Sequence, residues 1–296
     1  MAGFVDEVST PGTLGARPVG PRSMRGPFAT VLLLAPTLAF LAVFFVLPIA
    51  YVLALSVTDP TLSFAHFTRI FSTPLYLHVL WNTFVTSLLV TTLCLLLGYP
   101  LAYAIATRND AFSRVLLALV AISFWTGFVV RTYAWLIILG NRGPLVAVLK
   151  ATGIEPAPKL LFTSFSSTLG MVHILLPYMA LALYSVMKKF DVSYLRAAES
   201  LGARPFTAFR LVFFPLSLPG VVNGSILVFT ICLGFYVTPI LLGTPRDMMI
   251  SQLINQQIEE MLNFGFAAAL AIVLLAATAV ILGIYNRLVG LDRLWG

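Results

Sequence analysis

Charged residues are scarce in this sequence. Only 10% of its 296 residues are Asp, Glu, Lys or Arg, whereas 59% are hydrophobic. Roughly a quarter of the residues in a soluble globular domain are charged, because water has to cover its surface. The composition therefore excludes an ordinary soluble domain and predicts a polytopic membrane protein whose surface mostly faces lipid.

Residues with metal-binding or redox chemistry are also few. Both cysteines, Cys94 and Cys232, lie within hydrophobic runs and form no C-x-x-C motif. Of the three histidines, only His173 lies well inside such a run, where we expect it to form a hydrogen bond within a helix bundle rather than to bind haem. We therefore predict no cofactor and no catalytic, cofactor-binding or metal-binding residues.

The sequence lacks the motifs by which a membrane protein powers transport on its own. None of its four lysines follows a glycine or precedes Ser or Thr, so there is no Walker A loop, and H-E-x-x-H and G-x-S-x-G are also absent. Proton-coupled carriers usually need buried carboxylates, yet the hydrophobic runs contain no Asp or Glu. These absences favour a transport subunit energised by a separate ATPase. The alternatives are a gradient-driven secondary carrier and a non-transporting membrane scaffold.

Six hydrophobic runs are long enough to cross a bilayer, which takes about 20 apolar residues in a helix. They predict an all-α bundle of six transmembrane helices over residues 28–296, which include a loop at 188–220. Residues 1–27, rich in Gly, Pro and Arg, are expected to form a disordered cytoplasmic tail. The runs cover 28–57, 80–107, a third from 115 that Arg131 interrupts, a fourth that enters the membrane near Thr168 and ends before Lys188, 221–242 and 265–285.

The basic residues predict the orientation in the membrane. With the N-terminus in the cytoplasm, twelve Lys and Arg residues lie in the inner segments and six in the outer ones. The positive-inside rule therefore favours both termini in the cytoplasm. The first run is about twice as long as the apolar part of a signal peptide, which argues against cleavage. The longest outer segment, 133–167, is expected to contain a short helix rather than a seventh span.

The loop between the fourth and fifth runs predicts a helix, a glycine and a second helix. Asp191 or Ser193 is suited to cap the first helix, and Gly202 to end it in a left-handed conformation. Pro205 fits the first turn of a second helix, which we expect Pro215 to stop.

An apolar ridge runs along the first of these helices. Tyr194, Ala198 and Leu201 recur at i, i+4 and i+7 on a segment that otherwise faces water. A helix of about eight residues is not stable by itself in water, so it needs a packing partner. The ridge either folds back onto the chain's own span ends or docks on another protein.

The same loop resembles a known family. The sequence Arg196-Ala-Ala-Glu-Ser-Leu-Gly202, followed by Val-Phe-Phe-Pro215, is similar to the E-A-A-x-x-x-G-x9-I-x-L-P loop of permease subunits of binding-protein-dependent ABC importers. Arg196 departs from the pattern by reversing a charge, with Glu199 one turn later, and Val212 and Phe214 are apolar exchanges. The resemblance implies an ATPase-coupling loop, 191–215, whose residues are Tyr194, Arg196, Ala197, Ala198, Glu199, Leu201, Gly202 and Pro215.

Three other segments, 124–135, 236–243 and 263–269, look like the polyamine (spermidine/putrescine) branch of that family. The resemblance covers roughly 29–290 and implies a bundle of the type I ABC importer permease kind in the bacterial inner membrane. It also implies two ATPase subunits, a second permease subunit, identical or related, and an extracytoplasmic solute-binding protein. The implied cargo is a small solute, with a polyamine favoured over other small charged solutes such as an amino acid derivative or an organic anion.

Five polar or aromatic residues are candidates for the substrate path or an outer gate. Arg131 is the one cation that interrupts a hydrophobic stretch, and its other explanation is an arginine that extends to the interface beside interfacial aromatic residues. Hydrogen bonds between helices explain the two asparagines equally well. The five residues are Arg131, Tyr133, Trp135, Asn82 and Asn223.

Overall fold

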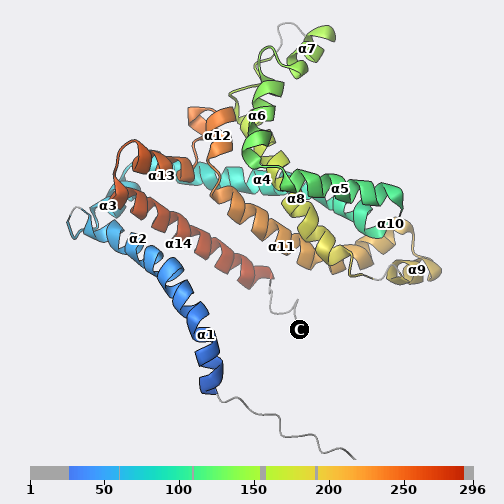
Figure 1. Cartoon of the computed structure of the whole chain (residues 1–296). Coiled ribbons are helices and arrows are strands. Elements are labelled where there is room, and N and C mark those ends of the chain that lie inside the picture. Colours follow the sequence, from blue (N-terminus) through green and yellow to red (C-terminus); the bar gives the residue numbers. More distant parts are fainter. Residues whose placement is uncertain (1–26, 60, 109, 154–157, 191–192, 290–296) are drawn as a thin grey trace, which may run out of the picture. The chain divides into compact units, whose positions relative to one another are not determined.

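The computed structural model describes residues 27–59, 61–108, 110–153, 158–190 and 193–289 (Figure 1). These residues form helices and turns and contain no strand. Six helical segments are long and apolar enough to cross a membrane, which confirms the predicted all-α, six-span class. They are Leu34–Thr58, Pro74–Thr107, Phe128–Ala151, Ser164–Met187, Pro205–Leu233 and Phe264–Tyr285. The predicted tail lies, except for Pro27, outside the described residues.

The chain divides into two units, Met1–Tyr51 and Val52–Gly296. In the first unit, helix α1 (Pro27–Leu41) continues through a π-helical turn, η1 (Ala42–Val46), into α2 (Leu47–Thr58), which runs on into the second unit. The π turn lies just before Pro48, which has no N–H to give to an α-helical hydrogen bond. The wider turn therefore lets the helix continue past the proline.

Three helices form the core of the second unit: α4 (Pro74–Thr107), α8 (Ser164–Met187) and α11 (Phe214–Leu233) (Figure 1). Small residues let these backbones approach closely, because a Cβ at Gly224 would lie 2.8 Å from the Met179 sulfur. Both cysteines are buried as free thiols in this core. The buried cluster includes Val90, Cys94, Met171, Leu175, Met179, Leu183, Val228 and Cys232.

The third hydrophobic run is not one helix. It forms α5 (Ala111–Trp125) and α6 (Phe128–Leu139), with extended backbone at Thr126 and at Gly127. The interruption therefore lies before Arg131 rather than at it. A short helix follows, α7 (Pro144–Ala151), within the segment where one was predicted. Together with α6 it makes up the third candidate span, Phe128–Ala151, which therefore begins later than the predicted residue 115. Helix α8 begins at Ser164, earlier than the predicted entry near Thr168, because Thr163 and Ser166 form a capping box.

The fifth run is also interrupted, in contrast to the prediction of one span to residue 242. Helix α11 ends at Leu233, and α12 (Val237–Leu242) begins after a turn at 234–236. A 3₁₀ turn, η3 (Pro245–Asp247), and helix α13 (Ile250–Glu259) lead to α14 (Phe264–Val289). The rings of Phe266 in α14 and Tyr76 in α4 pack edge to face, with centroids 5.1 Å apart. Nearby, α3 (Ala65–Ser72) places Arg69 over the Phe266 ring.

Pro215 does not stop a helix, so this prediction was wrong. Helix α10 (Pro205–Ala208) continues through a second π-helical turn, η2 (Phe209–Phe213), into α11. The N–H of Phe214 donates to the carbonyl of Phe209, five residues back. This wider turn shifts the hydrogen-bond register just before the proline, so that the helix continues past Pro215.

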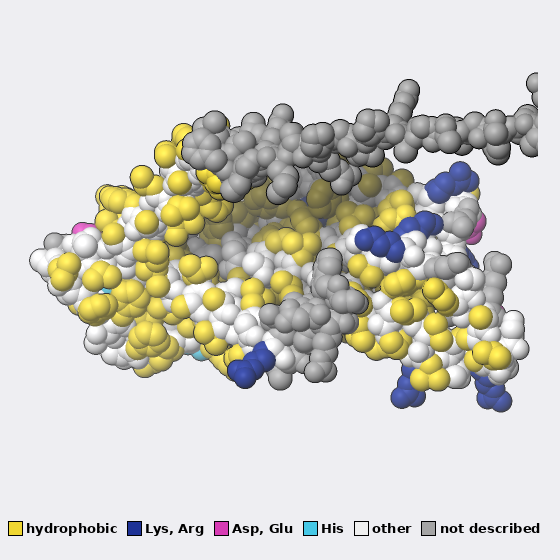
Figure 2. Space-filling view, turned by 90° about the horizontal axis from the view of Figure 1, so that it is seen from below, with side chains coloured by type: hydrophobic (Ala, Val, Ile, Leu, Met, Phe, Trp, Pro, Cys, Tyr) yellow, Lys and Arg dark blue, Asp and Glu magenta, His cyan; other side chains and the backbone are white. Residues whose placement is uncertain are grey.

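Hydrophobic and basic side chains are unevenly distributed on the surface. Figure 2 shows hydrophobic side chains over much of one face, with Lys and Arg side chains gathered mainly toward one end. Several basic residues close to the ends of α4, α5, α8 and α10 are exposed, namely Arg108, Arg114, Lys188, Lys189, Arg204 and Arg210.

Candidate functional site

The predicted coupling loop forms a short helix with a well-defined end. Helix α9 (Ser193–Ser200) is followed by Gly202 at φ +88°. The N–H of Gly202 donates to the Glu199 carbonyl at 2.9 Å, and the N–H of Ala203 donates to the Ala198 carbonyl at 3.0 Å. These two bonds form a Schellman motif, which confirms the prediction that Gly202 ends the helix in a left-handed conformation. The alternative cap, Asp191, lies outside the described residues.

The apolar ridge of α9 is largely uncovered. Tyr194 is 59% exposed and Leu201 is 91% exposed, while Ala198 is half-buried. A ridge folded back onto the chain's own span ends would bury these side chains, so the exposure favours docking on another protein. Ala197 and Glu199 are also exposed, whereas the side chain of Arg196 lies outside the described part of the chain.

Buried residues downstream of α9 anchor the loop to the core. Ala208 at the end of α10 and Phe213 in η2 are buried, and Phe213 belongs to the core cluster. Pro215, at the second position of α11, is exposed. The loop therefore has an exposed first half and an anchored second half.

The side chain of Arg131 is buried against helix α8. Its side chain is 6% exposed, and its Nη1 donates to the Ile174 carbonyl of α8 at 3.2 Å. Its Nε is buried without a hydrogen-bond partner in the described residues. Helix α6 therefore places Arg131 against α8. A buried guanidinium with a vacant donor is suited to bind a further acceptor.

Trp135 lies one turn after Arg131 and contacts the same helix. Its indole Nε1 donates to His173 Nδ1 at 3.1 Å, and the two rings meet edge to face. His173 therefore forms the hydrogen bond expected for a histidine inside a helix bundle. Tyr133 is 52% exposed and does not share this contact. Arg131 and Trp135 of α6 thus both contact α8, whereas Tyr133 does not share these contacts.

The two asparagines occupy different positions. Asn82 Nδ2 donates to the Met248 carbonyl at 3.1 Å, next to the bond from the Ile250 N–H to Thr83 Oγ1. Asn82 therefore connects α4 to the start of α13, as hydrogen bonding between helices would require. Asn223 is exposed on α11 and has no part in these contacts.

The two helix interruptions lie side by side, which sequence reasoning missed. The rings of Phe128, at the start of α6, and Phe235, in the turn after α11, are 6.2 Å apart. A hollow of about 110 Å³ is lined by Phe128 and residues 234–237. Irregular backbone at membrane depth is typical of sites that line a cavity or a transport path. The available signals were Gly127 and Gly234, which interrupt apolar runs.

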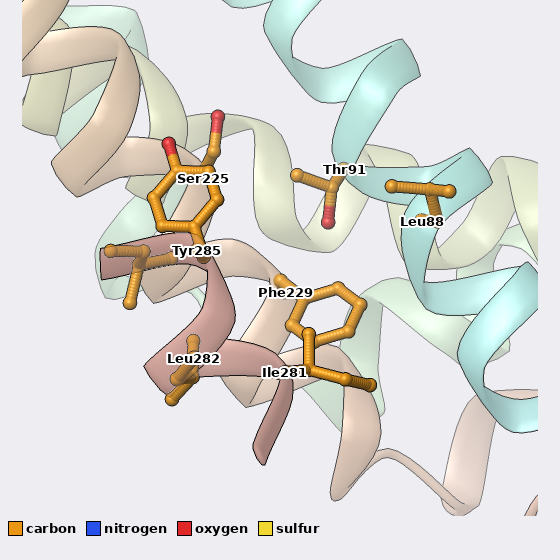
Figure 3. Close-up of a pocket in the computed structure, with 8 residues that line it drawn as sticks. Leu88, Thr91, Ser225, Phe229, Ile281, Leu282 and Tyr285 are labelled. Carbon is orange, nitrogen blue, oxygen red and sulfur yellow. The ribbon is translucent and has the colours of Figure 1, made fainter. Parts of the chain in front are cut away.

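A second hollow, of about 130 Å³, lies among α4, α11 and α14 (Figure 3). Its walls are mainly apolar, and the hydroxyl of Thr91 already donates to the Ser87 carbonyl. Figure 3 shows the Tyr285 ring and Ser225 on one side of it, with Phe229 and Ile281 further along. None of the described residues that line this hollow is charged, so they offer no anchor for an ionic solute. Its lining residues are Leu88, Thr91, Ser225, Ile226, Phe229, Ile281, Leu282 and Tyr285.

Known proteins resemble this chain over most of its length. Residues 95–290 match the family described as "Binding-protein-dependent transport system inner membrane component". The spermidine/putrescine transport system permease protein PotB of Haemophilus influenzae is 35% identical over 223 residues, which cover 75% of this chain and 78% of that protein. The molybdenum transport system permease protein ModB of Mycobacterium bovis is 32% identical over 199 residues, covering 67% of this chain and 74% of that protein.

A solved structure shares the fold. It is a bacterial alginate ABC transporter in complex with a periplasmic protein bound to an alginate pentasaccharide. The likeness has a TM-score of 0.72 at 16% identity and covers 88% of this chain and 93% of the other. This likeness confirms the predicted fold class, a helical bundle of the ABC importer permease type.

Proposed function

Because the chain belongs to the family of binding-protein-dependent transport system inner membrane components, as a permease subunit of an ABC importer, we propose that it moves a polyamine across the bacterial inner membrane. One observation carries the choice of cargo: 35% identity to a spermidine/putrescine permease over three quarters of this chain. The proposed partners are two ATPase subunits, a second permease subunit, identical or related, and an extracytoplasmic solute-binding protein.

We propose that the ATPase subunits dock on α9. The exposed Tyr194 and Leu201 support this assignment, because a helix this short needs a partner to cover its apolar ridge. The second half of the loop is anchored in the core through Phe213, so a movement of the docked ATPase has a direct route to α11. ATP binding and hydrolysis would then drive alternating access through this loop.

In the proposed orientation both termini lie in the cytoplasm. The excess of basic residues in the segments assigned to the inside supports it, as do the exposed Lys and Arg residues near the α9 end of the bundle. Reporter fusions after Asp110 and Gly202 should then report the cytoplasm, and fusions after Leu62 and Asp247 the outside. The reverse pattern would place α9 out of reach of a cytoplasmic ATPase.

A small anionic solute is the second candidate cargo. The buried Arg131, with its vacant Nε, favours a negatively charged group and disfavours a nearby polycation. The 32% identity to a molybdenum permease is compatible with a cargo of this kind.

Uptake by the reconstituted transporter tests the cargo. The complete complex, with its ATPase and solute-binding protein, is placed in proteoliposomes and supplied with labelled spermidine or with labelled molybdate. We expect ATP-dependent spermidine uptake that unlabelled putrescine reduces. Molybdate uptake alone would select the anionic candidate. Spermidine uptake by the permease without the ATPase would instead indicate a gradient-driven carrier.

A further inference from the structure

Six aromatic rings gather at the π turn η2, which joins the α9–α10 loop to the membrane helix α11. They come from three segments: helix α4, the turn after α8, and η2 with the residue that follows it. We call this group the aromatic clamp. Its members are Tyr99, Tyr103, Phe190, Phe209, Phe213 and Phe214.

Tyr103 lies at the centre of the clamp. Its ring centroid is 4.9 Å from that of Phe213 and 5.5 Å from that of Phe209, and both pairs meet at 89°. Phe209 and Phe213 stack on each other across the π turn, at 6.0 Å and 18°. Edge-to-face pairs are favourable beyond their buried area, so one tyrosine holds both ends of the turn.

Tyr99, one turn earlier on α4, adds a hydrogen bond. Its hydroxyl lies 2.8 Å from Ser217 Oγ, and that serine hydroxyl donates to the Phe214 carbonyl. Because the Ser217 hydroxyl proton is already donated to the Phe214 carbonyl, the Tyr99 hydroxyl is the donor in its hydrogen bond to Ser217. Ser217 is fully buried. Tyr99 thus connects α4 to the first turn of α11, just beyond η2.

The π turn η2 is the most easily bent point in the connection from α9 and α10 to α11. Its five residues form a wider turn than an α-helix, and Pro215 beyond it cannot restore an α-helical hydrogen bond. Helices bend most readily at such positions. Without support from α4, a displacement of α9 and α10 would be taken up by bending at η2 and would not reach α11.

We propose that Tyr103, supported by Tyr99, is a positioning residue for energy coupling. It holds η2 rigid, so that movement of the ATPase-docking helix passes to α11. The inference rests on the proposed docking of the ATPase at α9. Removing the Tyr103 ring should leave the ATPase bound and active but reduce the solute moved per ATP hydrolysed.

Three variants in the reconstituted complex test this proposal. For Tyr103→Leu we expect the ratio of solute transported to ATP hydrolysed to fall by roughly fivefold or more, since one aromatic pair changes an equilibrium by about that factor. For Tyr103→Phe we expect the wild-type ratio, because the ring edges remain. ATPase bound per permease is measured in the same preparations and should stay at the wild-type level in both.

Tyr76→Leu is the matched control on the same helix. Like the half-buried Tyr103, the buried Tyr76 is in edge-to-face contact with a phenylalanine, but it lies at the other end of α4. We expect this variant to lower the melting temperature and to keep the wild-type ratio. A purely structural role for Tyr103 would make the two leucine variants alike.

An unchanged ratio in Tyr103→Leu, or an equal fall in Tyr76→Leu, would overturn the proposal. If Tyr103→Leu does not reach the membrane, Phe209→Leu removes the same contact from the other side, and its ratio decides in the same way. A failure of the docking proposal gives a distinguishable result. If the ATPase does not dock on α9, Gly202→Asp, which alters the end of α9, would bind the ATPase normally.

Discussion

The three-helix core and helix α9 are opposite in their packing. In the core, α4, α8 and α11 bury their apolar side chains against one another, and Leu175 is 0% exposed. On α9, the ridge residue Leu201 is 91% exposed. The core therefore finds its packing partners within the chain, while α9 presents exposed apolar surface, on which we propose that the ATPase docks. A leucine in the core should accordingly contribute to the stability of the permease, and a leucine on the ridge to ATPase binding.

The largest expected effect is in the core. Leu175→Ala removes a fully buried side chain among close-packed helices, so we expect it to destabilise the protein by about 2–5 kcal/mol. The melting temperature of the purified permease measures this loss. A melting temperature equal to that of the wild type would mean that the core does not depend on this packing.

The next effect concerns the buried cation. Arg131→Lys replaces a planar guanidinium with a point charge, so the bond to the Ile174 carbonyl and the vacant Nε donor are not both reproduced. A hydrogen bond from a charged donor contributes about 1.5–3 kcal/mol, and we expect a partial loss of uptake. Uptake at wild-type rates by Arg131→Ala, at equal abundance, would exclude the residue from the mechanism.

At the end of α9 we expect a smaller effect on stability, but a large one on ATPase binding and transport. Gly202→Asp costs roughly 1 kcal/mol for the left-handed conformation and places a negative charge at the negative end of the helix dipole. We expect normal membrane abundance, weak ATPase binding and no transport. The matched control, Gly202→Asn, keeps the shape without the charge and should be milder, since asparagine tolerates this conformation. Normal uptake by Gly202→Asp would contradict the docking assignment.

The smallest effect on stability is expected on the ridge itself. Leu201→Ala should change the stability of the permease by less than about 0.5 kcal/mol, because its side chain is exposed. Its binding to the ATPase should weaken roughly tenfold, since the leucine would lose its buried position in the complex. A binding titration and a melting curve on one preparation separate the two properties. A loss of stability matching that of Leu175→Ala would remove the contrast between the regions.

Several features of the fold followed from residues close together in the chain. The six apolar segments depend on local hydrophobicity over about 20 residues. The end of α9 depends on a motif of six residues, 198–203, with a glycine that accepts positive φ. The ridge on α9 follows from helical periodicity, although its exposure does not. Each of these could be predicted because the interactions that cause it are local.

Other features depended on residues far apart in the chain. Pro215 was expected to end a helix, but the π turn before it is packed against Tyr99 and Tyr103, more than 100 residues earlier. The position of Arg131 likewise depends on the Ile174 carbonyl of another helix. In both cases an interaction between helices decided what a local pattern could not.

The sequence by itself determined the class of the protein, its apolar segments and the helix–glycine–helix loop, because hydrophobicity and backbone preference act over short stretches of chain. The tertiary structure alone decided that two of these segments are interrupted side by side, and that rings from three segments meet at the π turn. Those arrangements exist only once α4, α6, α8 and α11 are packed, since their contacts join side chains that the sequence leaves far apart.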